Sequence, residues 1–224
     1  MRTALIEAAA HLIAADGTHA LTLRRLADEV GTSTMSVYTH FGGMVELRRA
    51  VRHEGFARLA AHLAEVDNGD DPVADLTVLG GAYYCSATTS PHLYRVMFME
   101  NPLDETDADV GRDTFEVLVQ GVARCITAGR FDPADAAQLA TQLWAVAHGL
   151  ITLELAGLMA PPQAIDHLVA TVENLYRAYG DNPRSAARSA TAARRRISLD
   201  TDVTRTSARR PAKINTPRRS PRRR

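Results

Sequence analysis

The sequence predicts an all-α fold, in which three short N-terminal helices lead through a long helix into a larger helical region. Apolar residues recur at helical spacing along almost the whole chain of 224 residues. No run alternates apolar with polar residues as a half-buried strand does, and no Asn-Gly hairpin turn occurs. Glycine or proline marks most breaks between the apolar runs, as is typical where helices end and begin.

Three short amphipathic helices are expected first. One face of the first helix carries Leu5, Ala8, Ala9, Leu12 and Ile13. Thr22 is placed to cap the second helix, which ends at Gly31. Ser33 is placed to cap a third helix, whose residues Val37 and Phe41 are four apart and face inward.

A long fourth helix is expected from about Met44 to Val66. Further helices are expected near 72–88, 91–99, 107–129, 133–157 and 161–179. Beyond residue 180 the chain consists of Arg, Ser, Ala, Thr and Pro with almost no residue that forms a core. This basic tail is therefore predicted to be disordered in isolation.

The net charge of zero hides a strong asymmetry. Residues 181–224 hold 14 Arg or Lys against 3 Asp, whereas residues 59–180 hold 5 Arg against 17 Asp or Glu. The first 58 residues are nearly balanced, with 7 basic and 6 acidic residues. Nucleic acid is thus compatible with the two ends, and the acidic middle should repel it.

Several other classes of protein fit poorly. No stretch approaches the roughly 18 apolar residues that span a membrane, and the two cysteines favour a reducing cytoplasm. Cys85 and Cys125 fit small core fillers better than redox sensors. The histidines lack metal-site spacing, and neither a phosphate loop nor a nucleophile motif occurs, so no cofactor and no enzymatic activity is expected.

The stretch LTLRRLADEV-GTS-TMSVYTH has the form of a helix-turn-helix. With Val37 and Phe41 inward, the polar residues of the last helix must face out, where short polar side chains reach base edges and Tyr38 reaches a phosphate. The candidate DNA-binding residues are Thr22, Arg24, Arg25, Ser33, Thr34, Met35, Ser36, Tyr38, Thr39 and His40. The alternative is a small helical core without a DNA role, and His40 is equally compatible with a backbone contact and a plain surface position.

Residues 2–58 resemble the DNA-binding domain of TetR-family transcriptional repressors. The resemblance rests on IEAAAHLIAADG, LTLRRLADEVGTS and Y-x-H-F at 38–41, in this order. In the C-terminal half, HLYRVMF and the W-x-x-x-H-G pattern at Trp144, His148 and Gly149 resemble one group of TetR regulatory domains.

The resemblance implies a helix-turn-helix head over residues 1–43, a helical ligand-binding and dimerisation domain over 44–180, and the basic tail over 181–224. It implies a cytoplasmic homodimer that pairs through the helices at about 133–157 and 161–179. Two recognition helices would then reach successive major grooves of a palindromic double-stranded DNA operator. A small-molecule effector would move the fourth helix and release the operator, so the resemblance implies a repressor.

Two features depart from the family pattern. Family members usually have a basic arm before the first helix, whereas only Arg2 stands here, so either the arm is absent or the true start lies upstream. The fourth helix commonly starts with a basic residue, and this chain has Met44 there, with Arg48 and Arg49 one turn later. We therefore expect weaker anchoring to phosphates and a shallow salt dependence of operator binding.

The ligand pocket is expected among the middle helices. Aromatic, methionine and histidine side chains suit a mostly apolar cavity with a few polar groups. The candidates are Tyr83, Tyr84, Met97, Phe98, Met99, Phe115, Trp144 and His148. Each is also compatible with an ordinary core position, and His148 with a core histidine or with a subunit interface beside Gly149.

Two alternative functions remain open from the sequence. One is a helical protein that binds a ligand or partner without specific DNA binding, as Met44 and the missing arm permit. The other is a protein that binds DNA non-specifically through the tail at 181–224. That tail is also compatible with a solubilising extension or with a run of codons translated out of register.

Overall fold

The computed structural model describes the backbone of residues 1–208 and the side chains of residues 1–161 and 163–197. In this part of the chain every regular element is a helix, which confirms the predicted all-α class. The helices are α1 (Arg2–Asp16), η1 (Thr18–Ala20), α2 (Leu23–Val30), α3 (Thr34–Phe41), α4 (Met44–Ala64), α5 (Pro72–Thr89), α6 (Pro91–Phe98), α7 (Glu105–Asp109), α8 (Arg112–Thr127), α9 (Ala136–Leu155), α10 (Pro161–Ala178) and α11 (Pro183–Ala208). Within the described residues, no helix combines the length and apolar character needed to cross a bilayer.

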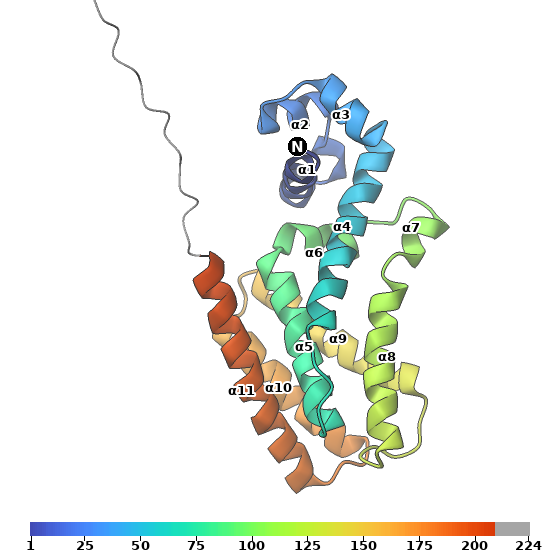
Figure 1. Cartoon of the computed structure of the whole chain (residues 1–224), viewed down its shortest axis with the longest axis vertical. Helices are drawn as coiled ribbons and strands as arrows, with labels where there is room; N and C mark the ends of the chain where they lie inside the picture. Colours follow the sequence, from blue (N-terminus) through green and yellow to red (C-terminus); the bar gives the residue numbers. More distant parts are fainter. Residues whose placement is uncertain (209–224) are drawn as a thin grey trace, which may run out of the picture.

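Helices α1–α3 form a head at one end of the molecule, and α4 leads from this head into the body formed by the later helices (Figure 1). A hydrophobic cluster, here called the head core, joins the two parts. Its buried members are Leu5, Ile6, Ala9, Ala10, Leu12, Ile13, Leu21, Leu26, Ala27, Val37, Phe41, Leu47, Val51, Leu93 and Val96. The last two belong to α6, so the head rests directly on this helix of the body.

The predicted helix ends of the head are confirmed. The Thr22 hydroxyl accepts a hydrogen bond from the backbone N–H of Arg25, and the Ser33 hydroxyl accepts one from the N–H of Ser36, each at 3.2 Å. Gly31 ends α2 with φ 70°, a left-handed conformation that glycine adopts without strain. The turn between α2 and α3 is therefore set by local sequence.

The single helix predicted over 107–129 is wrong, because the structure has α7 and α8 there. Gly111 separates them with φ 100°, and a Cβ on it would lie 2.1 Å from the ring of Phe56. Asp104 caps α7 by accepting from the N–H of Asp107 at 2.9 Å. The chain bends here because glycine permits both the backbone conformation and the close approach of Phe56.

Two smaller differences concern helix starts. The long helix expected from residue 133 begins at Ala136, since the Asp135 carboxylate caps it by accepting from the N–H of Ala137 at 2.9 Å. A short 3-10 helix, η1, also lies between α1 and α2, where no helix was predicted.

The largest correction concerns the tail, because the predicted disorder is wrong for residues 183–208. They form α11, which packs along α5 and α10 at the edge of the body (Figure 1). In the part of α11 whose side chains are described, up to residue 197, the buried residues are Ala186, Ser189, Ala190, Ala193 and Ile197. Small side chains at helical spacing let the backbones approach closely, and a Cβ on Gly81 of α5 would lie 2.6 Å from Ile197. The prediction for residues 209–224 lies outside the described residues.

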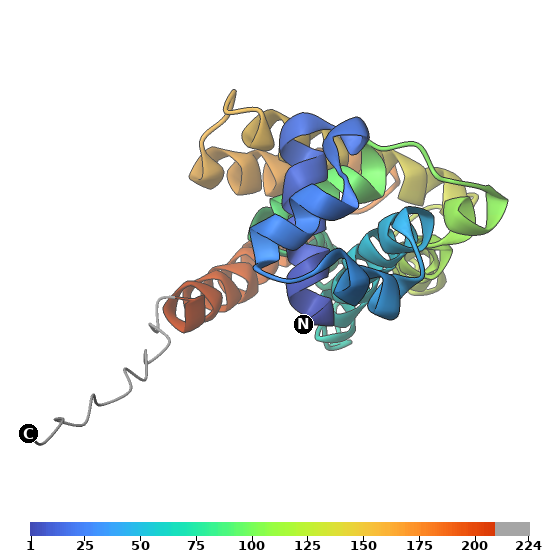
Figure 2. The ribbon, with the colours of Figure 1, turned by 90° about the horizontal axis from the view of Figure 1, so that it is seen from above.

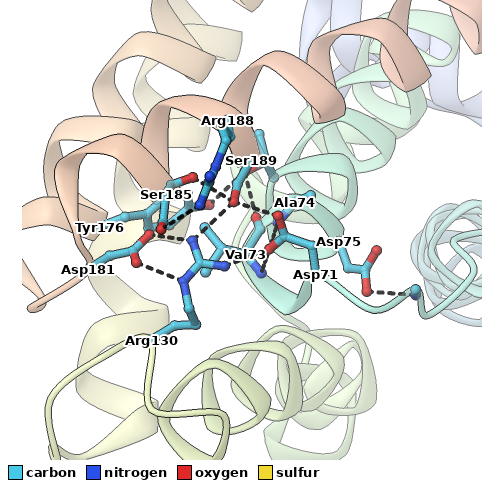
Figure 3. Close-up of polar contacts among 12 residues, drawn as sticks. Asp71, Val73, Ala74, Asp75, Arg130, Tyr176, Asp181, Ser185, Arg188 and Ser189 are labelled. Carbon is cyan, nitrogen blue, oxygen red and sulfur yellow. Dashed lines mark hydrogen bonds and ion pairs between the residues drawn. The ribbon is translucent and has the colours of Figure 1, made fainter.

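Polar contacts fix the beginning of α11 to the body (Figure 3). The Arg130 guanidinium donates to both carboxylate oxygens of Asp181 at 2.7 Å and to Asp71 at 2.9 Å. The Ser189 hydroxyl donates to Asp71 at 2.6 Å. Burial tends to raise the pKa of Asp71, but the hydrogen bonds from Ser189 and the Ala74 N–H, together with Arg130, outweigh it and lower the pKa.

Further along α11, two arginines pair with acidic residues of the body. Arg196 lies 2.7 Å from Asp75, which also contacts Arg124 at 3.2 Å. Arg194 lies 2.6 Å from Asp166 on α10. Part of the basic charge of the tail is thus paired with the acidic middle of the same chain.

Candidate DNA-binding surface and ligand cavity

Helix α3 has one buried and one exposed face. Val37 is fully buried and Phe41 is 8 % exposed, so both pack into the head core. On the other face, Met35 is 70 % and Tyr38 is 50 % exposed. The Thr39 hydroxyl is also exposed and donates to the Met35 carbonyl at 2.9 Å. The inward and outward faces are therefore as predicted from the spacing.

The structure brings all ten candidate DNA-binding residues onto α2, α3 and the turns before them. The exposed ones are Thr22, Arg24, Arg25, Ser33, Thr34, Met35, Tyr38, Thr39 and His40, and Ser36 is half-buried. Arg25 pairs with Asp16 at 2.5 Å. A phosphate would have to compete with this ion pair for Arg25, whereas Arg24 is exposed beside it. The roles of these residues at DNA stay predictions.

The first two turns of α4 contain a basic residue that is already paired with an acidic one. Met44 packs against the head core. Arg49 pairs with Asp104 at 2.8 Å, and this hydrogen bond lowers the pKa of Asp104 to about 2. The Arg2 guanidinium lies 5.3 Å from the ring centre of Phe41, at the end of α3. Arg2 thus lies against α3, whereas Arg49 is already paired with Asp104.

A cavity of about 610 Å³ lies in the body between α4, α5, α8, α9 and α10. Its aromatic lining residues are Phe56, Tyr83, Phe98, Phe115, Trp144 and Tyr176. Four of them were predicted from the sequence, namely Tyr83, Phe98, Phe115 and Trp144. Leucines from α4, α5 and α8 complete the mainly apolar wall.

Other predicted pocket residues lie elsewhere. The Tyr84 hydroxyl donates to Glu154 at 2.5 Å, which ties α5 to the end of α9. Met97 packs on Gly55, where an added Cβ would lie 2.5 Å from its sulfur, and Met99 is 51 % exposed. Tyr84 follows Tyr83 directly, and adjacent residues on a helix point about 100° apart, so only one of the two faces the cavity.

His148 stands behind the cavity wall in a polar cluster. Its Nδ1 lies 2.9 Å from the Tyr83 hydroxyl and 2.5 Å from the Tyr94 hydroxyl. The Trp144 indole N–H donates to the Tyr83 hydroxyl at 3.3 Å. Burial lowers the pKa of His148 and raises that of Tyr94 to about 12, so both groups are neutral near pH 7. Sequence reasoning missed Tyr94, although it lies in the HLYRVMF stretch.

Arg52 on α4 lines the cavity and was also missed by sequence reasoning. Its side chain is 12 % exposed, and burial lowers its pKa although Asp107 opposes this. The signal in the sequence was a basic residue between the apolar Val51 and Phe56. Nothing in the spacing indicated which groups it meets.

Chemical groups for metal or thiol chemistry are sparse. Among the side chains that the structure describes, no cluster of three His, Cys, Asp or Glu residues could hold a metal ion. Cys125 is buried, and this burial raises the pKa of its thiol to about 12. The Cys125 thiol therefore stays protonated at neutral pH.

Two parts of the chain match models of one protein family. Residues 5–51 match the model described as bacterial regulatory proteins, tetR family. Residues 76–175 match the tetracyclin repressor-like C-terminal domain. The chain belongs to the TetR family. The resemblance seen in its sequence motifs is thereby confirmed, and the protein is a DNA-binding transcriptional regulator.

Relatives of the TetR-family chain agree with this assignment. It is 29 % identical over 158 residues to the uncharacterized HTH-type transcriptional regulator Rv0681 of Mycobacterium tuberculosis, covering 70 % of this chain and 72 % of the relative. Among solved structures, a Rhodococcus protein of unknown function is 26 % identical with TM-score 0.68, over 80 % of this chain and 94 % of that one. The TetR family regulator PfmR from Thermus thermophilus shares the fold, with 21 % identity, TM-score 0.66, and coverage of 77 % and 97 %.

The TetR family match does not extend over the whole structure. The C-terminal model ends at residue 175, before α11 begins at Pro183. Seen from above the head in Figure 2, α11 emerges at one side of the molecule, and in both views it lies apart from α3. It is thus an addition to the matched part of the family fold.

Proposed function

We propose that this regulator binds a palindromic operator as a homodimer, represses transcription there, and is released by a small molecule bound in the cavity. The proposal rests on the course of α4, which runs from the head core to the cavity. Leu47 and Val51 of α4 belong to the head core, while Phe56, Leu59 and Leu63 line the cavity. A ligand that displaces the second half of this helix would move the first half together with the head.

In this proposal α3 is the recognition helix. Its outward Thr34, Met35 and Thr39 suit base edges and thymine methyl groups, and the Tyr38 hydroxyl suits a phosphate. Arg24 and Arg2 supply basic groups beside it. Because Arg49 is paired with Asp104, we expect α4 to anchor phosphates weakly and the operator affinity to depend only weakly on salt.

The homodimer is proposed to form through α9 and α10. Exposed small residues line one side of α9, among them Ala145 and Gly149, and Ala170 is exposed on α10. A Cβ added to Gly149 would meet no atom within 4 Å. Helices that meet along small side chains can approach closely, as in a four-helix bundle formed from two copies.

A gel shift tests the proposal. It uses the purified full chain, DNA from upstream of its own gene, excess non-specific competitor and physiological salt. A discrete complex that Tyr38→Ala abolishes is the expected result, because the specific contacts lie on α3. No discrete complex, with smearing only, would favour a helical protein without specific DNA binding or one that binds through its tail.

A shortened chain tests whether the head or the end of the tail carries the DNA affinity. The cut belongs after residue 208, because a cut at 182 removes α11 and exposes the apolar faces of Val78 and Val169 beneath it. If residues 1–208 retain the discrete complex, the head is the specific reader. Loss of all binding on this deletion would place the affinity in residues 209–224.

Light scattering tests the dimer. Gly149→Arg places a long charged side chain in the proposed interface without touching the protomer, so the expected product is a folded monomer. Ala60→Arg, on the exposed side of α4, is the matched control and should stay dimeric. A dimer that survives Gly149→Arg would contradict pairing through α9.

A further inference from the structure

The polar atoms of Arg52 are less well satisfied than those of the other cavity residues. Its Nη1 donates to the backbone oxygens of Val96 and Glu100, both at a long 3.3 Å. Its Nε lies 3.8 Å from the Asp107 carboxylate and has no hydrogen-bond partner. A guanidinium group carries five N–H donors, so Arg52 retains donors for a further acceptor.

The remaining polar groups around the cavity are engaged within the protein. The Trp144 N–H donates to the Tyr83 hydroxyl. The hydroxyls of Thr77 and Thr141 donate to backbone carbonyls of their own helices at 2.8 Å. Arg112 is paired with Asp109 at 2.5 Å and is largely exposed at the rim. A bound molecule therefore meets an apolar wall and, in its interior, the donors of Arg52.

From this contrast we infer that Arg52 recognises the effector, which is an apolar molecule with an oxygen acceptor, a carbonyl or a carboxylate, at one end. The inference rests on the proposed function, since it names the ligand class of the same cavity. An oxygen acceptor supplies what the guanidinium lacks. A cationic end group would bring like charge against Arg52 and offer no acceptor.

Arg52 also lies where three helices meet. It belongs to α4, holds the backbone oxygens at the end of α6, and faces Asp107 of α7. Its guanidinium carbon lies 5.6 Å from the ring centre of Phe56, which packs on Gly111. A ligand oxygen that accepts hydrogen bonds from Arg52 draws these donors away from the backbone oxygens at the end of α6. This loosens a helix whose Leu93 and Val96 are part of the head core. Recognition and release thus meet at one side chain.

Asp107 determines how this is tested. It is 2 % exposed, accepts from the Leu103 N–H at 2.9 Å through one oxygen, and has no partner for the other. Removing Arg52 alone would leave a buried carboxylate without its counter-charge, which is strongly destabilising. The test variant is therefore the double change Arg52→Met with Asp107→Asn.

The molecule provides a matched control. Arg49 and Asp104 form a second pair between α4 and α7, one turn away on both helices and absent from the cavity lining. The double change Arg49→Met with Asp104→Asn removes a similar link between the same helices without altering the cavity. It separates loss of the α4–α7 contact from loss of ligand recognition.

Trp144 is the only tryptophan of the chain and lines the cavity, so its fluorescence reports binding directly. The full-length protein is titrated with 2-decanone, decanoate and decylammonium, which share an apolar chain and differ in the end group. We expect the ketone or the carboxylate to bind at least about tenfold more tightly than decylammonium. The Arg52/Asp107 variant should lose this preference, and the Arg49/Asp104 control should keep it.

The ketone and the carboxylate distinguish a neutral from an anionic acceptor, and a preference for either supports the inference. Three results overturn the inference. Decylammonium binds as tightly as the ketone and the carboxylate, none of the three probes binds up to its solubility limit, or the Arg52/Asp107 variant keeps the preference of the wild type. If circular dichroism shows that this variant is unfolded, Arg52→Lys replaces it, which keeps the charge but loses the planar fork and should weaken the preferred probe. The titration contains no DNA, so a failed gel shift leaves its result intact.

Discussion

Helices α3 and α11 both carry polar residues of the kind that binds DNA, but their surroundings differ. On α3 the outward side chains, such as Tyr38 and Met35, are exposed and free of the body. On α11, Ser189 bonds to Asp71 (Figure 3), and Arg196 pairs with Asp75, whereas Arg195 stays exposed. The contacts of Ser189 and Arg196 thus occupy polar groups of a kind that α3 leaves available to another molecule.

The difference teaches that the net charge of a segment overstates the electrostatic potential at its surface when the rest of the chain is oppositely charged. Residues 59–180 hold 17 acidic residues, and α11 lies against some of them. The arginines paired there are neutralised locally, which reduces their attraction for phosphates. Arg194 and Arg196 therefore contribute less to non-specific DNA binding by the tail than their charge suggests.

Breaking the ion pair between Arg130 and Asp181, just before α11, should have the largest effect on stability. Asp181 is 1 % exposed in its side chain, and Asp181→Ala leaves Arg130 with Asp71 as its remaining carboxylate partner. We expect the free energy of unfolding in urea to fall by about 2 to 3 kcal/mol, less than for a fully buried pair because Arg130 is partly exposed.

The control is Arg194→Ala, whose pair with Asp166 is about half exposed on both sides. Its cost should stay below about 1 kcal/mol. Equal losses for the two variants would mean that the contacts of Figure 3 do not hold α11 in place.

A smaller effect is expected on DNA affinity from the tyrosine hydroxyl of α3. Tyr38→Phe removes only this group, and we expect the operator affinity to fall about fivefold, as for the loss of one hydrogen bond, with unchanged thermal stability. Fluorescence anisotropy at fixed salt measures it. Arg195→Gln on the exposed side of α11 should change the affinity less than about twofold, and a larger loss there would assign α11 to the DNA interface.

The smallest effect concerns Arg49, a basic residue near the head that is paired like those of α11. Its partner Asp104 has a pKa lowered to about 2, so the pair stabilises the folded state above the ordinary carboxyl pKa. That stability is lost as the pH falls from about 4 to about 2. Asp104→Asn preserves a helix-capping residue, so the variant should melt slightly below the wild type near neutral pH and equally at about pH 2. A difference that persists at low pH would contradict this origin.

Much of the head was predictable because its determinants are local. Caps at Thr22 and Ser33 and the four-residue spacing of Val37 and Phe41 set both the helix-turn-helix and its exposed face. Helix α11 was missed because buried residues were expected to be large, whereas Ala190 and its neighbours bury a face by close backbone approach.

The cavity was predictable only in part. Trp144 and Phe115 followed from composition, but Arg52 depends on backbone oxygens 44 and 48 residues away in sequence. The break at Gly111 escaped notice for the same reason, since Phe56 comes from a distant helix. Contacts between distant segments leave little signal in a single sequence.

The seating of the head on α6 limits how far the protein can be treated as two exchangeable modules. Leu93 and Val96 of the body complete the head core, whereas the N-terminal family match stops at residue 51. A chimera that joined residues 1–51 to another regulator's body would place the head on a foreign helix. Transferring this DNA specificity to another regulator therefore requires transferring the surface of α6 as well. The grafted head then keeps the residues on which it packs and its orientation relative to the body.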